Sequence, residues 1–414
     1  MSFRHTDIES FPIGTEVFSE TRSWRRHAFH RWQTNVFSRI SGGLSTRVWQ
    51  QQYFSPLQIR AESGSESVTD VPDVGTVAVL QRLADAARAV PDARHWQFIH
   101  DQSARHRIIR TPEGRIFEAR NTWQDWVIAA QYCDESGEMK TFRRVWGFPA
   151  EAEVDLPETW IHDCAEQLAA LKQARTMPAG QYPVIFSGGW NGIWLHEVLG
   201  HLLEADVMQH WKPGYVAPGQ LVLPEFCHVV DDPTEPNARV SYAFDDEGTT
   251  AKPLFLVENG RVSGLMTDRT RAVALKLPMT GHARRASFRD EPFPRTSNIR
   301  LHATDGQSGD PEAWCSSIRS GIWVEELGTA RLDPHIPQIH LDVALGYRIE
   351  NGKRTHPIRQ AAIRMHPQAF LHAFVTATGA VQTESGRGIC EKQGQFLPVS
   401  VGQPSVFFRE LTVF

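Results

Sequence analysis

Apolar positions in the first half of the chain predict two helices with a run of strands between them. The first helix covers residues 77–90 and is ended by Pro91. The second covers about residues 157–175. The Pro-Ala-Gly segment at residues 178–180 ends the second helix and is the predicted domain boundary. The apolar faces are Val77, Leu80, Leu83, Ala84, Ala87 and Val90 in the first helix, and Trp160, Ile161, Cys164, Leu168 and Leu171 in the second.

Between these helices the pattern changes to the alternation that is typical of strands. Residues 108–109 and 116–117 flank a turn, and residues 127–133 face residues 140–146 across a second turn. Residues 62–73 are polar and are interpreted as a loop. We therefore expect residues 1–178 to form a domain of helices on a mostly antiparallel sheet.

Residues 179–414 are predicted to form a second, largely β domain, so the expected fold class is α+β. A strand at residues 182–186 precedes an apolar helical segment at residues 194–206. The pairs Asn259-Gly260 and Asn351-Gly352 are strong signals for hairpin turns. Terminal strands are expected at residues 369–378 and 406–414.

The composition and net charge of the chain limit the kinds of molecule that it is expected to bind. The 414 residues are 41% hydrophobic, which is enough for two or three domain cores, and the net charge of −5 gives no overall attraction to nucleic acid. Basic and aromatic residues interleave at residues 24–32, and acidic residues lie nearby. This pattern favours a surface strand or a protein contact over a site for single-stranded nucleic acid.

The predicted location is the cytoplasm, without attachment to a membrane. The five cysteines are scattered and form no CxxC pair, which suits a reducing compartment better than a disulfide framework. The first residues are too polar for a signal peptide. No run approaches the ~18 apolar residues of a membrane span.

The strongest chemical signal is the hexapeptide HEVLGH at residues 196–201. Imidazole is a suitable zinc ligand, and a carboxylate beside the metal can take a proton from water, so His196, Glu197 and His201 indicate a metal-dependent hydrolase. The histidines stand about 140° apart on a regular helix. Shared ligation therefore requires a π-type turn or a helix end, which we expect around Gly200.

The third ligand has to come from elsewhere in the chain, because a catalytic zinc usually has three protein ligands and one open position. Carboxylates, other histidines and the cysteines are all candidates. Cys390 is distinctive because several glycines surround it and Lys392 would favour its thiolate. Spacing alone does not choose among these, and a buried structural role for the two histidines is the common alternative.

The segments around the hexapeptide resemble the TldD/PmbA proteins, metallopeptidases that are also called modulators of DNA gyrase. The resemblance runs from about Pro183 to the end of the chain, and its blocks follow the family order. These blocks are residues 186–189, 195–197, 227–232, 245–249, 257–260, 264–269, 281–285, 292–298, 390–395 and 401–404.

The resemblance implies a zinc ion held by His196, His201 and Cys390, with Glu197 as the catalytic carboxylate. It also implies a two-domain subunit that works as a dimer and cleaves short or unfolded peptides in the cytoplasm. The second subunit is either another copy or a paralogue that lacks the metal ligands. Because this chain keeps all four residues, it resembles the metal-bearing, TldD-like type.

Three features depart from the family pattern. Glu391 stands where a small residue usually follows the ligand cysteine, and residues 202–204, Leu-Leu-Glu, replace a segment in which glycine is common. The amino-terminal third resembles the family poorly. These departures leave the candidate ligands in place and concern substrate preference and choice of partner.

Several other polar residues have two interpretations. Asp245 and Asp246 could form a second acid or metal site, but the Glu-Gly-Thr that follows favours a capped turn. Arg284 and Arg285 could bind a substrate carboxylate, although surface arginines are more common. Three further imidazoles could each stabilise an oxyanion, and the sequence does not choose among His210, His228 and His282.

The main hypothesis is a zinc metallopeptidase in which Glu197 acts as the general base. One rival is a non-catalytic binding or assembly subunit whose metal is structural, since structural zinc normally has four protein ligands. Another alternative is a protease dedicated to the maturation of one precursor peptide.

Overall fold

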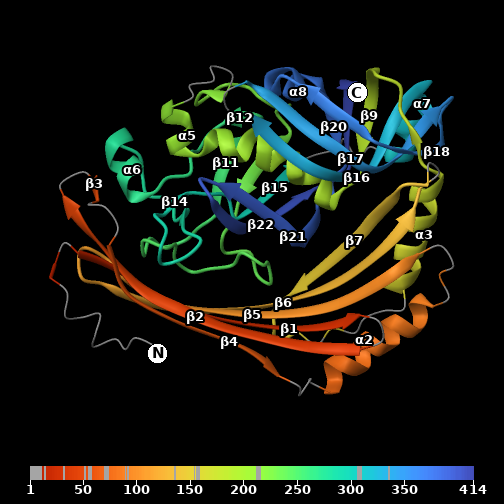
Figure 1. The fold of residues 1–414 in the computed structure, drawn as a ribbon. Helices are drawn as coiled ribbons and strands as arrows, with labels where there is room; N and C mark the ends of the chain where they lie inside the picture. Colours follow the sequence, from red (N-terminus) through yellow and green to blue (C-terminus); the bar gives the residue numbers. More distant parts are fainter. Residues whose placement is uncertain are drawn as a thin grey trace.

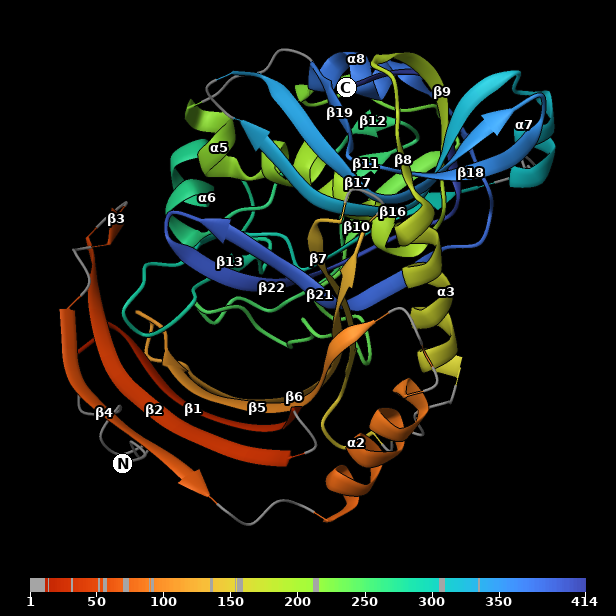
Figure 2. The same cartoon turned by 45° about the vertical axis from the view of Figure 1, so that its right-hand side comes forward.

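The computed structural model describes residues 12–13, 15–30, 33–50, 53–54, 58–69, 74–88, 90, 93–134, 137–152, 154, 159–210, 216–304, 310–333 and 336–414. These residues form a mixed fold of helices and predominant strands, which confirms the α+β class (Figure 1). A long curved sheet from the N-terminal part lies beneath the C-terminal part, with its concave face toward it (Figures 1 and 2).

The curved sheet is antiparallel throughout, as predicted. Its strands follow the order β3-β2-β1-β5-β6-β7, and β4 also pairs with β2. The expected hairpins are present, because β5 joins β6 through the turn that begins at Thr111 and Tyr132 of β6 lies opposite Lys140 of β7. The bounds are β1 Thr15–His30, β2 Gln33–Gln50, β3 Tyr53–Phe54, β4 Gln58–Thr69, β5 Arg94–Arg110, β6 Ile116–Cys133 and β7 Met139–Phe148.

The interpretation of residues 62–73 as a loop is wrong for residues 62–69. These residues belong to β4, which pairs antiparallel with β2 so that Ser65 lies opposite Ile40. Backbone pairing at the edge of a sheet requires no apolar alternation, and polar residues are common on edge strands. Residues 70–73 lie outside the described residues. Of the two interpretations of residues 24–32, a strand or a protein contact, the strand is present for residues 24–30, within β1, and residues 31–32 are likewise outside the described part.

Two amphipathic helices cover one end of the curved sheet, close to their predicted positions. They are α2, Val74–Ala87, and α3, Thr159–Gln173. Their apolar faces share one core with the sheet, in which the rings of Trp146 and Trp160 stack with centroids 4.1 Å apart. None of the described helices is long and apolar enough to cross a lipid bilayer.

The C-terminal part contains two larger sheets with a shared hydrophobic core. One has the order β16-β9-β23-β19-β17-β18-β8, with β20 beside β23, and the other has the order β12-β11-β10-β15-β22-β21. The first comprises β8 Arg175–Thr176, β9 Gly180–Phe186, β16 Ser320–Asp333, β17 Gln338–Glu350, β18 Lys353–Arg359, β19 Ala361–Met365, β20 Phe374–Ala377 and β23 Val406–Val413. The second comprises β10 Cys227–Asp231, β11 Leu254–Glu258, β12 Arg261–Val262, β15 Asn298–Ala303, β21 Gln382–Lys392 and β22 Gln395–Gln403.

Short helices and a small two-stranded sheet complete this part. The small sheet pairs β13, Ala283–Arg284, with β14, Phe293–Pro294. The helices are α4 Ile193–Leu195, α5 Ala205–His210, α6 Arg269–Leu275, α7 Pro311–Ser317 and α8 Pro367–Ala373.

Both predicted Asn-Gly hairpins are confirmed, at the β11–β12 and β17–β18 connections. All four turn residues have positive φ angles, between 49° and 79°, as this turn class requires. The strand predicted at residues 369–378 is wrong for its first half, which is helix α8. Pro367 at the first helical position favours a helix start, and the His366 side chain accepts from the backbone N–H of Gln368.

Candidate metal centre

The helical segment that follows β9 changes its winding at the hexapeptide. It runs from a short 3-10 turn, Gly189–Gly192, through α4 into one π-helical turn, His196–Gly200, and then into a second 3-10 turn, His201–Leu203. A π turn brings residues five apart nearly into line. The expected irregularity at Gly200 is therefore confirmed, and both imidazoles face the same side.

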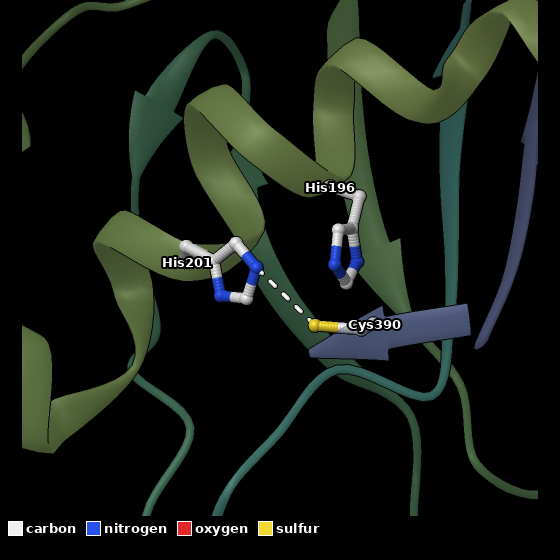
Figure 3. A group of neighbouring side chains, drawn as sticks. All are labelled: His196, His201 and Cys390. Carbon is white, nitrogen blue, oxygen red and sulfur yellow. Dashed lines mark hydrogen bonds between the residues drawn. The ribbon is translucent and has the colours of Figure 1, made fainter. Parts of the chain in front are cut away.

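Cys390 of β21 meets these two imidazoles (Figure 3). The rings of His196 and His201 have centroids 4.5 Å apart, and the Cys390 Sγ lies 3.4 Å from the His201 Nε2. One ligand atom from each of the three residues lies within 4.8 Å of the others. The structure thus brings together the three residues that the sequence resemblance implied as ligands.

The Nδ1 atom of each imidazole already has a hydrogen-bond partner. The His196 Nδ1 lies 2.8 Å from the Thr296 hydroxyl, and the His201 Nδ1 lies 3.2 Å from the Glu204 Oε2. The His196 Nε2 is buried, with no hydrogen-bond partner in the described part of the chain. Two Nε2 atoms and a thiol sulfur with oriented rings fit the donor set and the supporting contacts of a zinc site.

Glu197 lies next to this cluster on the same π turn and is only 9% exposed. Burial raises the pKa of its carboxyl group, and the nearby imidazoles of His201 and His196 oppose this shift. A carboxyl group with a raised pKa exchanges a proton more readily near neutral pH.

The two imidazoles favour ionisation of the Cys390 thiol. Burial favours the neutral thiol, but the imidazoles of His201 and His196 outweigh it and hold the pKa well below its usual range. Lys392, which was expected to favour the thiolate, instead places its Nζ 2.7 Å from the Glu204 Oε2 and 2.9 Å from the Asp206 Oδ1. Lys392 therefore acts on the carboxylate that orients His201.

The residues with two interpretations lie outside the cluster. Asp245 caps a turn, as favoured, by accepting the backbone N–H of Glu247 at 3.0 Å. Arg284 and Arg285 are both buried, so the expectation of surface arginines is wrong. His282 is buried, and its Nε2 lies 3.3 Å from the Asp231 Oδ1. The His228 Nδ1 accepts from the backbone N–H of Asn259. The side chain of His210 is not among those described.

Three supporting residues escaped the sequence analysis as functional candidates. Thr296 and Glu204 hold the rings, and the Arg295 guanidinium donates to the Cys390 carbonyl at 2.9 Å. Glu204 offered a faint signal, because it follows His201 by three residues. Thr296 and Arg295 lie about a hundred residues away, and nothing in their local sequence indicates these contacts.

Comparison with known proteins agrees with this geometry. The model of the PmbA/TldA metallopeptidase C-terminal domain matches residues 179–414, which is more than half of the chain. A metalloprotease TldD homologue of Haemophilus influenzae is 32% identical over 57% of this chain and 48% of its own length. A zinc metalloprotease TldD homologue of Saccharolobus solfataricus is 31% identical over 58% of this chain and 52% of its own length.

The chain spans about half the length of these curated relatives. Among solved structures, TldE of Thermococcus kodakarensis has the same fold, with a TM-score of 0.70 over 96% of both chains at 12% identity. The match to the family model, together with the ordered sequence blocks, assigns the protein to a family: the chain belongs to the TldD/PmbA metallopeptidases.

Proposed function

We propose that this chain is a zinc-dependent metallopeptidase that hydrolyses peptide bonds of short or unfolded peptides. The observation that carries the proposal is the convergence of one ring nitrogen each of His196 and His201 with the Cys390 Sγ beside a buried carboxylate. The metalloprotease names of the relatives, one of which specifies zinc, support the same chemistry.

The three residues would hold the metal, and Thr296 and Glu204 would fix the imidazole orientations. Zinc bound here would supply a Lewis acid that lowers the pKa of water and polarises the scissile carbonyl. Glu197 would accept the proton of the attacking water and then deliver it to the departing amine. Its buried position beside the ligands suits both transfers.

The rival of a structural metal in a binding or assembly subunit is less well supported. Structural zinc normally has four protein ligands, whereas this cluster has three members among the described residues. A protease dedicated to one precursor would use the same centre. The working unit is proposed to be a homodimer or a heterodimer with a metal-lacking paralogue, and the shared fold with TldE supports the second form.

The test combines metal analysis with peptide cleavage. We expect Glu197→Gln to retain zinc but to lose cleavage of unfolded peptides by about 10²–10⁴-fold, because the proton acceptor is gone. Glu258→Gln, an exposed glutamate on β11, is the matched control and should leave cleavage unchanged. Cleavage at the wild-type rate in Glu197→Gln would refute the assignment.

The third ligand is tested separately with Cys390→Ser. We expect this variant to bind zinc more weakly than the wild-type chain in a chelator competition, because the thiolate is lost. An unchanged zinc affinity would mean that another residue completes the site. Each assay is run on the chain alone and with a metal-lacking paralogue, so that a requirement for the second subunit is detected.

A further inference from the structure

A second candidate site is a cleft of about 580 Å³ between the curved sheet and the C-terminal part. Strands β5 and β6 form one wall, and the segment 237–246, Arg284 and residues 396–398 of β22 form the other. Figures 1 and 2 show β21 and β22 above the concave face of the sheet. A cleft of this volume is large enough for part of a peptide or a small ligand.

The cleft is lined by more positive than negative side chains. Of the acids, Asp246 pairs with Arg105 and Arg107, and the Asp245 carboxylate accepts backbone N–H groups. Two further arginines have acidic partners in the curved sheet: Arg22 pairs with Glu20, and Arg239 pairs with Asp125. The charged lining residues are Arg22, Arg105, Arg107, Arg120, Arg239, Arg284, Asp245 and Asp246.

Arg284 is the unusual member of this set, because it is buried and forms no ion pair with any described residue. Its side chain is 6% exposed, and within the described part of the chain its guanidinium donates to the backbone carbonyls of Thr296 and Pro398. Buried charges are normally paired, because burial of an unpaired charge is costly. Neutral carbonyls satisfy these N–H groups, and Asp246 and Asp231 act on the charge only through space, so the guanidinium has no ion-pair partner among the described residues.

Arg120, on the opposite wall, supplies a second guanidinium group. It is exposed on β6 and makes no ion pair within the described part of the chain, although it contributes to the electrostatics of the exposed Glu151. Phe396, which is 65% exposed, adds an apolar surface to the same cleft. Two guanidinium groups and an aromatic ring that line one cleft provide a surface for an anionic peptide segment.

The cleft lies close to the candidate metal centre. Thr296, whose carbonyl accepts from Arg284, also bonds His196 through its hydroxyl at 2.8 Å. On the other side, Leu397 of the cleft wall lies opposite Cys390 in the β21–β22 pair. A peptide that reaches the metal centre can therefore place a neighbouring group in the cleft.

We propose that this cleft is a subsite for a carboxylate of the peptide substrate, either an acidic side chain or the free C-terminus. Arg284 and Arg120 would bind the carboxylate, and Phe396 would pack against the adjacent side chain. Guanidinium groups recognise carboxylates through paired hydrogen bonds. This inference rests on the proposed function and specifies the substrate class of the same site.

The test measures binding by calorimetry to the zinc-loaded Glu197→Gln chain, which leaves peptides uncut. The probes are short Ala/Gly peptides that differ only in one Glu or Gln, each with a free or an amidated C-terminus. We expect the peptides that carry a carboxylate to bind about tenfold more tightly. This preference should decrease with added salt, because exposed charges are screened.

Substitutions of Arg284 and Arg120 then test whether the cleft causes the preference for peptides that carry a carboxylate. Arg284→Gln should abolish it, Arg284→Lys should retain part of it, and Arg120→Gln should reduce it by about two- to fivefold. Arg115→Gln, an exposed arginine outside the cleft, is the matched control and should change nothing. Zinc content is measured in each variant, because Arg284 contacts Thr296. If Arg284→Gln loses zinc, the Arg120→Gln result still decides.

Several outcomes would overturn the proposal. They are equal binding of all four peptides, an unaltered preference in both arginine variants, or tighter arginine-dependent binding of a single-stranded oligonucleotide. A failure of the proposed peptidase function would give a different set of results from a failure of the carboxylate subsite. In that case the wild-type chain cleaves no peptide, while the arginine-dependent preference for a carboxylate persists.

Discussion

The hydroxyl of Thr296 lies 2.8 Å from the His196 Nδ1, and this contact decides which ring nitrogen faces Cys390. The His201 ring is oriented in the same way by Glu204, whose own charge is balanced by Lys392. Burial opposes ionisation of Glu204, but Lys392 and His201 outweigh it and hold the pKa well below its usual range. Neither Thr296 nor Glu204 is one of the three candidate ligands, so we regard both as positioning residues.

We expect Thr296→Val to weaken zinc binding by about 10–100-fold, because the ring loses its hydrogen-bond partner while the side-chain volume is kept. Competition with a chelator measures the affinity. Thr296→Ser restores the hydroxyl and should restore the affinity. Thr376→Val is the matched control, since the Thr376 hydroxyl is buried without a hydrogen-bond partner among the described residues. Equal zinc affinity in Thr296→Val and wild type would contradict the positioning role.

At the scale of elements, the π turn depends on close packing around Gly200. A Cβ atom at this position would lie 2.8 Å from the Thr296 Cγ2, which is shorter than ordinary van der Waals contact. Glycine therefore allows the turn to approach the segment that orients His196. The five-residue spacing of the histidines and the contact with Thr296 are two consequences of one local geometry.

We expect Gly200→Ala to lower the free energy of unfolding by about 1–3 kcal/mol, because the added methyl group overpacks the contact with Thr296. Zinc affinity should fall with it, since Thr296 must shift. Gly379→Ala is the matched control, as a Cβ there would meet no atom within 4 Å. Urea unfolding with zinc titration measures both effects, and a Gly200→Ala chain as stable as wild type would show that the turn tolerates a side chain.

The elements differ in how far their own sequence determines them. The amphipathic helices α2 and α3, the Asn-Gly hairpins and an irregular winding at Gly200 were predictable, because each is indicated by residues close together in the chain. Strand β4 was not predictable, because its own sequence has no apolar alternation. It is held in the sheet by backbone pairing with β2. The contact between Thr296 and His196 could not be predicted from the sequence either, because a hundred residues separate the two partners.

At the scale of the whole molecule, buried ion pairs connect the curved sheet to the C-terminal part. Arg47 of β2 pairs with Glu247 at 2.8 Å, Glu16 of β1 pairs with Arg285 at 2.7 Å, and Asp246 pairs with Arg105 and Arg107 of β5. The partners lie far apart in the sequence, so the chemistry of single segments did not reveal them. Their burial makes the arrangement of the two parts dependent on charge.

Asp246 makes this dependence measurable. Burial disfavours its charged form, but the guanidinium groups of Arg105, Arg107 and Arg285 outweigh this cost and hold its pKa below the ordinary value of 3.8. A carboxylate whose pKa is lowered by folding stabilises the fold above its ordinary pKa, and this stabilisation is lost as the pH falls toward the folded-state value. The contribution of Asp246 should therefore be complete at neutral pH and should decline below about pH 4.

We expect Asp246→Asn to lower the free energy of unfolding by about 3–5 kcal/mol at pH 7, because it leaves buried arginines without their carboxylate. The difference from wild type should narrow as the pH falls below about 4, because Asp246 of the unfolded wild-type chain takes up a proton there while the folded chain still keeps the carboxylate ionised. Urea unfolding at a series of pH values measures this, with the exposed Asp163→Asn as the matched control. A difference that stays constant between pH 7 and pH 3 would mean that the residue acts through packing, and the two parts would then be held together without this charge.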